Sequence, residues 1–152
     1  MALGNKMRTF LSLPMRQKLL YIEAFYFLGW ARVFKMLPFS KVAPALGVYM
    51  QETPYTYEDA HVPVIVDVSR AVRTMSRYTW WESRCLVMAI AAMKMLERRG
   101  VACTLYMGTA KDENGRMIAH AWLRSGRRTL TGAEGKERFT VVGKFAKYVQ
   151  VR

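Results

Sequence analysis

Two side chains in this sequence have the chemistry of a nucleophile and its base. Cys85 precedes an almost wholly apolar run that ends at Leu96, and His120 follows 35 positions later, between two alanines. A thiolate attacks carbonyl carbon, and a nearby imidazole can take the thiol proton and return it to a leaving group. The pair predicts catalysis of acyl transfer, provided that the fold brings the two side chains together.

The residues before Cys85 predict that its thiol lies at the start of a helix. Ser83 is a residue type that caps helix N-termini, which would place Cys85 in the first turn. The N–H groups of a first turn lack intrahelical partners and the helix dipole is positive there, so both favour a thiolate. The same N–H groups can stabilise an oxyanion on the attacked carbonyl.

The apolar run itself predicts a central, buried helix. Ala89 and Ala92 share the face of Cys85 and would let a sheet approach closely, while larger apolar side chains cover the other sides. Gly100 suits the position just after the last helical turn.

The chain beyond this helix predicts an antiparallel sheet. Apolar and polar residues alternate from 101 to 107, and His120 lies in a second strand segment, 117–124, after a polar hairpin. Pairing outward from a turn at Ser125-Gly126 places Thr131 directly across from His120. Further strands are expected at 127–131 and 139–143.

The N-terminal half predicts helices. One runs from Met15 to about Met36 and is apolar nearly all round. Pro38 and Pro44 follow it and are expected to end it. The remaining segments are an expected loop at 51–63, a stretch at 62–66 that suits either a strand or a helix, and a helix at 67–77 that Asp67 could cap.

This order of elements predicts an α+β fold, in which N-terminal helices and a central Cys-bearing helix pack on a C-terminal antiparallel sheet. We expect a flexible basic lead-in at residues 1–14 and a single domain over 15–152. Within that domain, 15–50 would be an N-terminal helical segment and 78–145 the catalytic core.

The strongly basic composition predicts an anionic partner. Twenty-four Lys and Arg against 11 Asp and Glu give a formal net charge of +13, which suits nucleic acid, anionic lipid or an acidic peptide. The basic residues are scattered in ones and twos, so the charge alone identifies no partner. We expect no nucleic acid among the partners. The apolar stretch 19–31 is shorter than the about 20 residues that span a bilayer. We expect a cytoplasmic protein, with association at a membrane surface left open.

The small number of cysteines and histidines argues against a structural zinc site. Besides Cys85 and His120 the chain has only Cys103 and His61, and no CxxC pair. No metal or cofactor is expected. We interpret Cys103 as a core residue and His61 as a surface residue. A disulfide between the two cysteines remains an alternative to two free thiols in a reducing compartment.

A resemblance to a known family sharpens these expectations. Its segments are Ser83-Arg84-Cys85-Leu86, the run from Leu96 to Val101, Ala119-His120-Ala121-Trp122, Leu37-Pro38-Phe39 with the apolar helix before it, and Phe139-Thr140-Val141. Together they resemble the leader peptidases of lasso-peptide biosynthesis, the B2 proteins, over roughly residues 17–145. The resemblance implies a transglutaminase-like, papain-related cysteine protease fold.

The resemblance also implies roles for individual residues. Cys85 would be the nucleophile, and His120 the general base and later the general acid. The family's triad has an acidic third member shortly after the histidine, but the corresponding segment, 128–132, contains no acid. The weak candidates for that place are Thr131 and, in the loop after it, Glu134. A Cys–His dyad can also act without a carboxylate, because a thiolate is accessible near neutral pH.

The short members of that family work beside other proteins. The resemblance therefore implies a precursor peptide as substrate, a separate small leader-recognition protein as partner, and an ATP-dependent cyclase that closes the lasso ring.

Three hypotheses follow for the function of the chain. The first is a cysteine peptidase that removes the leader of a lasso-peptide precursor. The second is another acyl-transfer enzyme on the same fold, a transglutaminase or an amidase, which uses the same two residues. The third is a non-catalytic basic module that binds nucleic acid or membrane, with Cys85 as part of the core.

Overall fold

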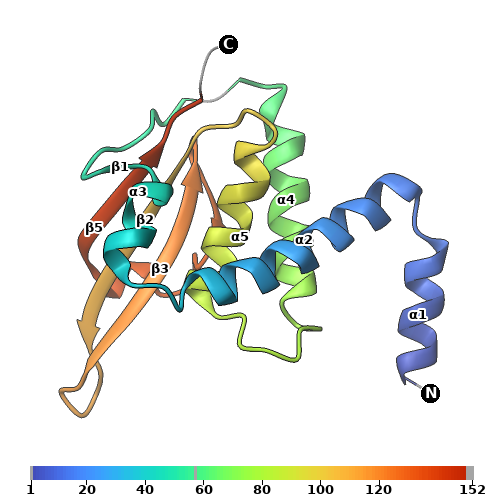
Figure 1. Ribbon diagram of the computed structural model, residues 1–152, viewed down its shortest axis with the longest axis horizontal. Coiled ribbons are helices and arrows are strands. Elements are labelled where there is room, and N and C mark those ends of the chain that lie inside the picture. Colours follow the sequence, from blue (N-terminus) through green and yellow to red (C-terminus); the bar gives the residue numbers. More distant parts are fainter. Residues whose placement is uncertain (1, 57, 150–152) are drawn as a thin grey trace.

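Helix α5 (Cys85–Glu97) packs on a five-stranded antiparallel sheet in the computed structural model, which describes residues 2–56 and 58–149 (Figure 1). The strands stand in the order β1-β5-β2-β3-β4, and each neighbouring pair is antiparallel. They are β1 (Val48–Tyr49), β2 (Cys103–Lys111), β3 (Met117–Ser125), β4 (Arg128–Thr131) and β5 (Thr140–Lys147). The predicted α+β class, with helices first and a Cys-bearing helix on an antiparallel sheet, is confirmed.

The outer side of α5 is covered by α2 (Met15–Phe34) and α4 (His61–Met75), so this helix lies between the sheet and two other helices (Figure 1). Such a position suits its sequence, because a helix that is apolar all round has no face for solvent. A shorter helix, α3 (Phe39–Leu46), packs beside β5, where Lys147 Nζ donates to the Ala45 carbonyl at 2.9 Å.

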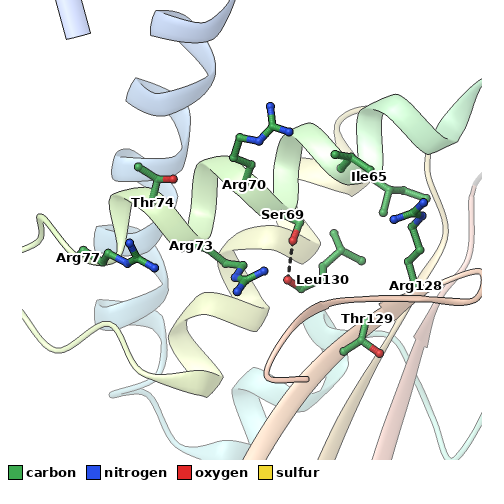
Figure 2. Close-up of a pocket in the computed structure, with 10 residues that line it drawn as sticks. Ile65, Ser69, Arg70, Arg73, Thr74, Arg77, Arg128, Thr129 and Leu130 are labelled. Atoms are coloured by element: carbon green, nitrogen blue, oxygen red, sulfur yellow. Dashed lines mark hydrogen bonds between the residues drawn. The ribbon is translucent and has the colours of Figure 1, made fainter. Parts of the chain in front are cut away.

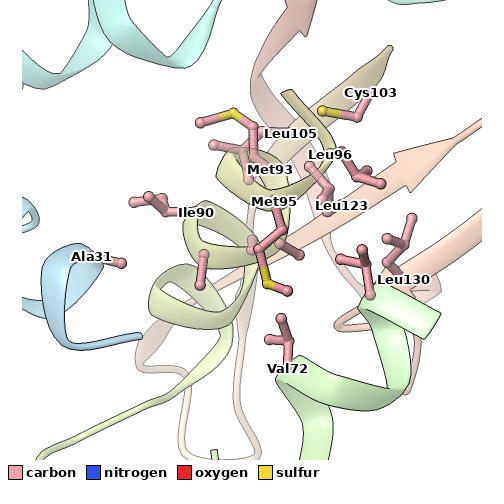
Figure 3. Packing of buried hydrophobic residues seen from close by; sticks show 14 of the residues in the cluster. Ala31, Val72, Ile90, Met93, Met95, Leu96, Cys103, Leu105, Leu123 and Leu130 are labelled. Atoms are coloured by element: carbon pink, nitrogen blue, oxygen red, sulfur yellow. The ribbon is translucent and has the colours of Figure 1, made fainter. Parts of the chain in front are cut away.

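The core is formed where α5 meets the inner face of the sheet. Figure 3 shows Met93 and Leu96 of α5 among Leu105 of β2 and Leu123 of β3, with Leu130 of β4 nearby. All five side chains are at most 2% exposed. Burial of each such side chain contributes about 1.5–3 kcal/mol to stability, so this contact fixes α5 on the sheet.

The opposite face of the sheet is held by a buried arginine. Arg124, only 6% exposed, donates to the carbonyl oxygens of Thr53 at 2.8 Å and Gly126 at 2.7 Å, and to Tyr106 Oη at 2.9 Å. Its guanidinium also lies 3.9 Å from the centroid of the Tyr55 ring. These bonds fasten the segment that follows β1 across the back of the sheet.

Several boundaries differ from those predicted. Residues 62–66 are helical and belong to α4, because that helix begins at His61, so Asp67 lies inside it and pairs with Arg16 at 3.4 Å instead of capping it. Pro44 lies within α3. The two-residue β1 was not predicted, and β2 and β5 extend several residues beyond their predicted ends.

The expected lead-in at 1–14 contains a helix, α1 (Ala2–Ser12), none of whose residues is buried (Figure 1). Its sequence places Leu3, Met7 and Leu11 one turn apart, a spacing that supports a helix with an apolar stripe. Residue 1 lies outside the described part of the chain. Within that part, no helix combines the length and apolarity needed to cross a bilayer.

An ion pair ties α2 to the C-terminal end of α5. Both carboxylate oxygens of Glu23 bind the Arg99 guanidinium, at 2.8 and 2.7 Å, and Arg98 adds a third bond at 2.9 Å. Burial would raise the pKa of the Glu23 carboxyl, but the hydrogen bonds and charges of Arg99 and Arg98 outweigh it and hold that pKa below its ordinary value. The pair therefore stabilises the fold above the unfolded-state pKa of the carboxyl, and this contribution is lost as the pH falls through the folded-state pKa.

Replacement of this carboxyl tests the ion pair. Glu23→Gln should lower the free energy of unfolding near neutral pH by about 1–2 kcal/mol. The difference from wild type should shrink as the pH falls through the lowered folded-state pKa of Glu23, because the wild-type carboxyl then becomes protonated. Urea unfolding at neutral and at acidic pH measures this difference. Glu113→Gln, in the exposed β2–β3 hairpin, is the matched control. An equal loss at both pH values would show that the charge of Glu23 is not what stabilises the fold.

Candidate active site

Cys85 is the first residue of α5, as predicted, but the residue that precedes the helix is not the expected cap. The Arg84 carbonyl accepts the first helical bond, from the Met88 N–H at 2.9 Å, so Arg84 occupies the N-cap position and its side chain makes no capping bond. The prediction that Ser83 is the N-cap is wrong. Its hydroxyl is used elsewhere and accepts a bond from Thr79 Oγ1 at 2.8 Å.

This arrangement leaves the first turn of α5 without a side-chain cap. The N–H groups of residues 85–87 have no intrahelical partner, and they stand at the positive end of the helix dipole. A thiolate or an oxyanion beside Cys85 would therefore be stabilised by these groups.

The two cysteines have different surroundings. Cys85 is half-buried, at the edge of the core, and both thiols are free, so the alternative of a disulfide does not hold. Cys103 is 0% exposed, and burial raises the pKa of its thiol to about 12. The interpretation of Cys103 as a core residue is confirmed. Of the two thiols, only that of Cys85 lies near the surface.

His120 lies in β3 and is oriented by a main-chain carbonyl. Its Nε2 is 2.8 Å from the oxygen of Gly132. A carbonyl oxygen only accepts, so Nε2 must donate, and in the neutral ring the lone pair is then on Nδ1. The geometry thus selects one tautomer and leaves Nδ1 as the basic nitrogen.

Gly132 can take this place because it has no side chain. Its φ is +71°, a left-handed conformation that favours glycine. A Cβ at this position would collide with the Ala121 carbonyl oxygen and lie 2.9 Å from Trp122 Cβ. A residue with a side chain would not fit at this position. The Gly132 carbonyl thus accepts the hydrogen bond that an acidic residue accepts from the histidine of a Cys–His–acid triad.

Aromatic rings surround the imidazole of His120. The centroid of the Phe139 ring is 5.0 Å from that of the imidazole, and the Trp122 ring is 5.8 Å away. Gly108 lies beside both, and a Cβ there would come within 2.9 Å of Phe139 Cβ. The absence of a side chain at Gly108 thus lets these two rings close around the histidine.

Neither candidate for the third member of the triad contacts His120. Thr131 pairs with Leu123, because the turn is formed by Gly126 and Arg127 and a bulge follows, in which Leu130 is the extra residue of β4, so the predicted register is wrong. The Thr131 hydroxyl is buried and has no hydrogen-bond partner in the described part of the chain. Glu134 is exposed in the loop after β4.

The Gly132 carbonyl was not among the predicted site residues. The glycine directly after a predicted strand was a signal for a special backbone conformation. The predicted turn after β3 was displaced by one residue. The resulting register error placed Thr131 across from His120, where the Gly132 carbonyl lies.

Cys85 and His120 lie toward the same end of the α5–β3 contact but on opposite faces of the sheet, and they are not joined. A short connection leads from the end of α5 to the start of β2, which pairs with the end of β3, so the first turn of α5 lies toward the first half of β3 (Figure 1). His120 belongs to the sheet face of Trp122, whereas α5 packs on the face of Ala121 and Leu123. No hydrogen bond from the Cys85 thiol occurs among residues 2–56 and 58–149.

The edge of β3 beside His120 has no strand partner beyond β4, although Gly132 lies against it. β4 ends at Thr131, which pairs with Leu123, so the earlier residues of β3 have no strand partner on that side. The bond to Gly132 turns the imidazole toward this edge.

The remaining candidate residues do not extend the site. His61 begins α4 and is half-buried, with its Nε2 3.8 Å from a Glu58 carboxylate oxygen. Trp81 packs against Gly29 of α2 and the Phe25 ring. Across the described ranges, no group of three Cys, His, Asp or Glu side chains could hold a metal ion.

Comparison with known proteins gives one match. The sequence model of the transglutaminase-like superfamily matches residues 27–144, which include both Cys85 and His120. No curated protein and no solved structure has significant similarity to the chain.

Alkylation distinguishes the two thiols. Under native conditions iodoacetamide should modify Cys85 and leave Cys103 unmodified, because Cys103 is enclosed in the core and its thiol holds its proton. Both should react after unfolding. Peptide mass spectrometry locates the label, and Cys85→Ala, which should take up none, is the control. Equal labelling of both cysteines in the folded protein would contradict the described burial.

The tautomer of His120 is a second measurable property. Nitrogen chemical shifts of the neutral ring should identify the proton on Nε2. Gly132→Ala should abolish that preference, because the added Cβ forces the carbonyl away from the ring. Thr131→Val is the matched control, since it removes only an unpaired buried hydroxyl and should keep the tautomer. A wild-type proton on Nδ1 would rule out the bond to Gly132.

Proposed function

Since the chain belongs to the transglutaminase-like superfamily, we propose that it is a cysteine enzyme of acyl transfer, and that it removes the leader peptide from a lasso-peptide precursor. One observation supports the chemistry above all: the single accessible thiol of the described chain is the first residue of the central helix, at its uncapped end.

In the proposed reaction, His120 Nδ1 takes the proton of the Cys85 thiol. The thiolate attacks the carbonyl carbon of the last leader residue and forms a C–S bond, and the oxyanion is stabilised by the free N–H groups of the first turn of α5. The imidazolium returns its proton to the leaving amine as the C–N bond breaks. Water, activated by His120, then hydrolyses the thioester and regenerates the thiol.

The Gly132 carbonyl has a defined part in this scheme. It holds the Nε2 proton throughout, and thereby keeps Nδ1 as the nitrogen that exchanges a proton with sulfur and substrate. A neutral carbonyl stabilises the imidazolium less than a carboxylate would. A Cys–His pair tolerates this loss better than a serine enzyme, because a thiol ionises more readily than a hydroxyl.

Direct contact between Cys85 and His120 belongs to the complex with substrate in this proposal. Catalytic hydrogen bonds are often long or poorly aligned in the free enzyme and tighten when substrate binds. Because the imidazole lies on the sheet face away from α5, the proposal requires a change in the path of β3 or of the first turn of α5 when substrate binds.

The finer assignment to lasso-peptide maturation rests on the resemblance of the segments around Cys85 and His120. The same resemblance implies a separate leader-recognition protein, which would present the precursor, and an ATP-dependent cyclase, which would act on the product. We propose that exposed apolar side chains on α1 and α2, such as Met7, Leu19 and Ile22, are available for contact with such a partner.

Cleavage of a precursor tests the proposal. With a lasso precursor and its recognition protein, the wild-type chain should release the leader, and Cys85→Ala and His120→Asn should each lower the rate by about 1000-fold or more. Mass spectrometry of the products measures the release. Thr131→Val, which removes a buried hydroxyl that has no hydrogen-bond partner in the described chain, is the control and should retain activity.

The products also separate the proposal from its alternatives. A covalent adduct with an added amine, in place of the free acid, would identify a transferase. Undiminished leader release by Cys85→Ala would refute cysteine catalysis.

A further inference from the structure

A groove lies between α4 and β4, on the side of the molecule away from β1. Its volume is about 520 Å³. Figure 2 shows α4 forming one wall and β4 the other, with Ser69 Oγ donating to the Leu130 carbonyl at 2.7 Å across its floor. It is lined by Ile65, Val66, Ser69, Arg70, Arg73, Thr74, Arg77, Arg128, Thr129 and Leu130.

Four arginines line this groove, and no acid does. Arg70, Arg73 and Arg77 come from α4, and Arg128 comes from β4. All four are exposed, and none forms an ion pair or a side-chain hydrogen bond with another described residue. By contrast, Arg99 binds Glu23. Four unpaired cations around one groove repel one another, and an anionic ligand would relieve that repulsion.

The arginines are spread along the groove instead of converging on one point. The three positions on α4 share one side of the helix and span about 10 Å along its axis, from a rise of about 1.5 Å per residue. In Figure 2, Arg77 and Arg128 lie toward opposite ends, with Arg73 between them. This spacing suits an extended ligand with several negative charges better than a single phosphate.

We propose that the groove between α4 and β4 binds an acidic segment of a peptide in an extended conformation. Its carboxylates would pair with the four guanidinium groups. Ile65 and Leu130, both buried, would give its backbone an apolar floor. β4 is the edge strand of the sheet, but its Leu130 carbonyl is already held by Ser69, so the guanidinium groups would provide the main polar contacts.

Single-stranded nucleic acid fits the groove less well. Such ligands bind through a basic track together with aromatic side chains on which the bases stack. No aromatic residue lines the groove.

The groove also leads toward the candidate active site. β4 continues through Thr131 into Gly132, whose carbonyl holds His120, so Leu130 lies two residues from that contact, about 7 Å along a strand. A peptide that occupies the groove could therefore extend to His120. The identification of this peptide as the substrate rests on the proposed function, whereas its binding does not.

Binding is measured without turnover, on the Cys85→Ala background. A fluorescent hexaglutamate peptide should bind, hexaglutamine should not, and added salt should weaken the binding. The triple variant Arg70→Gln/Arg73→Gln/Arg77→Gln should bind hexaglutamate about tenfold or more weakly. The matched control is Arg8→Gln/Lys111→Gln/Arg116→Gln, which removes three exposed charges elsewhere and should change binding less than about twofold. A cooperative thermal unfolding transition in each variant would establish that both are folded.

Three results would overturn the proposal. An equal loss in both triple variants would show that net charge alone attracts the peptide. Tighter binding of a single-stranded oligonucleotide than of hexaglutamate, also lost in the groove variant, would assign the groove to nucleic acid. Displacement of the peptide by inorganic phosphate at equal charge concentration would assign it to small anions. Because cleavage is absent from this assay, failure of the peptidase proposal would leave the binding result unaffected.

Discussion

The structure depends on the enclosure of one helix. α5 is apolar on every side, and the sheet covers one of its faces while α2 and α4 cover the rest. This enclosure determines what can remain accessible along the helix. From Ala89 to Met93 every residue is buried, whereas Cys85, at its first position, is half-buried and borders the surface. The same burial that stabilises the fold therefore brings a reactive side chain to the surface at a fixed place.

Much of this arrangement follows from sequence pattern. The apolar run predicted α5, alternation predicted β2, the polar hairpin after it predicted the return in β3, and the glycine after α5 predicted the end of that helix. These signals are local, since each depends on residues within one or two turns of one another. The N-terminal helix α1 escaped prediction because its short apolar stripe lies in a basic, exposed segment. Residues 62–66 remained ambiguous because a short run of valine and isoleucine suits either a strand or a helix.

The details of the candidate site were less accessible from sequence. A difference of a single residue in the β3–β4 turn, together with a bulge, changed the partner of Thr131 from His120 to Leu123. A contact made by a main-chain carbonyl also leaves no trace in side-chain type, so a search for an acid could not find Gly132. In the same way, the arginines at 70, 73 and 77 follow helical spacing, but the contribution of Arg128 depends on how β4 lies beside α4.

The group that accepts the hydrogen bond from His120 Nε2 is a peptide carbonyl, which has no proton to gain or lose near neutral pH. A carboxylate in that role takes up a proton in acid and then lets the ring turn. An amide oxygen stays neutral throughout the physiological range, so the group that aligns the ring has no charge that acid could remove. The alignment of the ring is thereby tied to the path of the main chain and is insensitive to the ionic composition of the solvent.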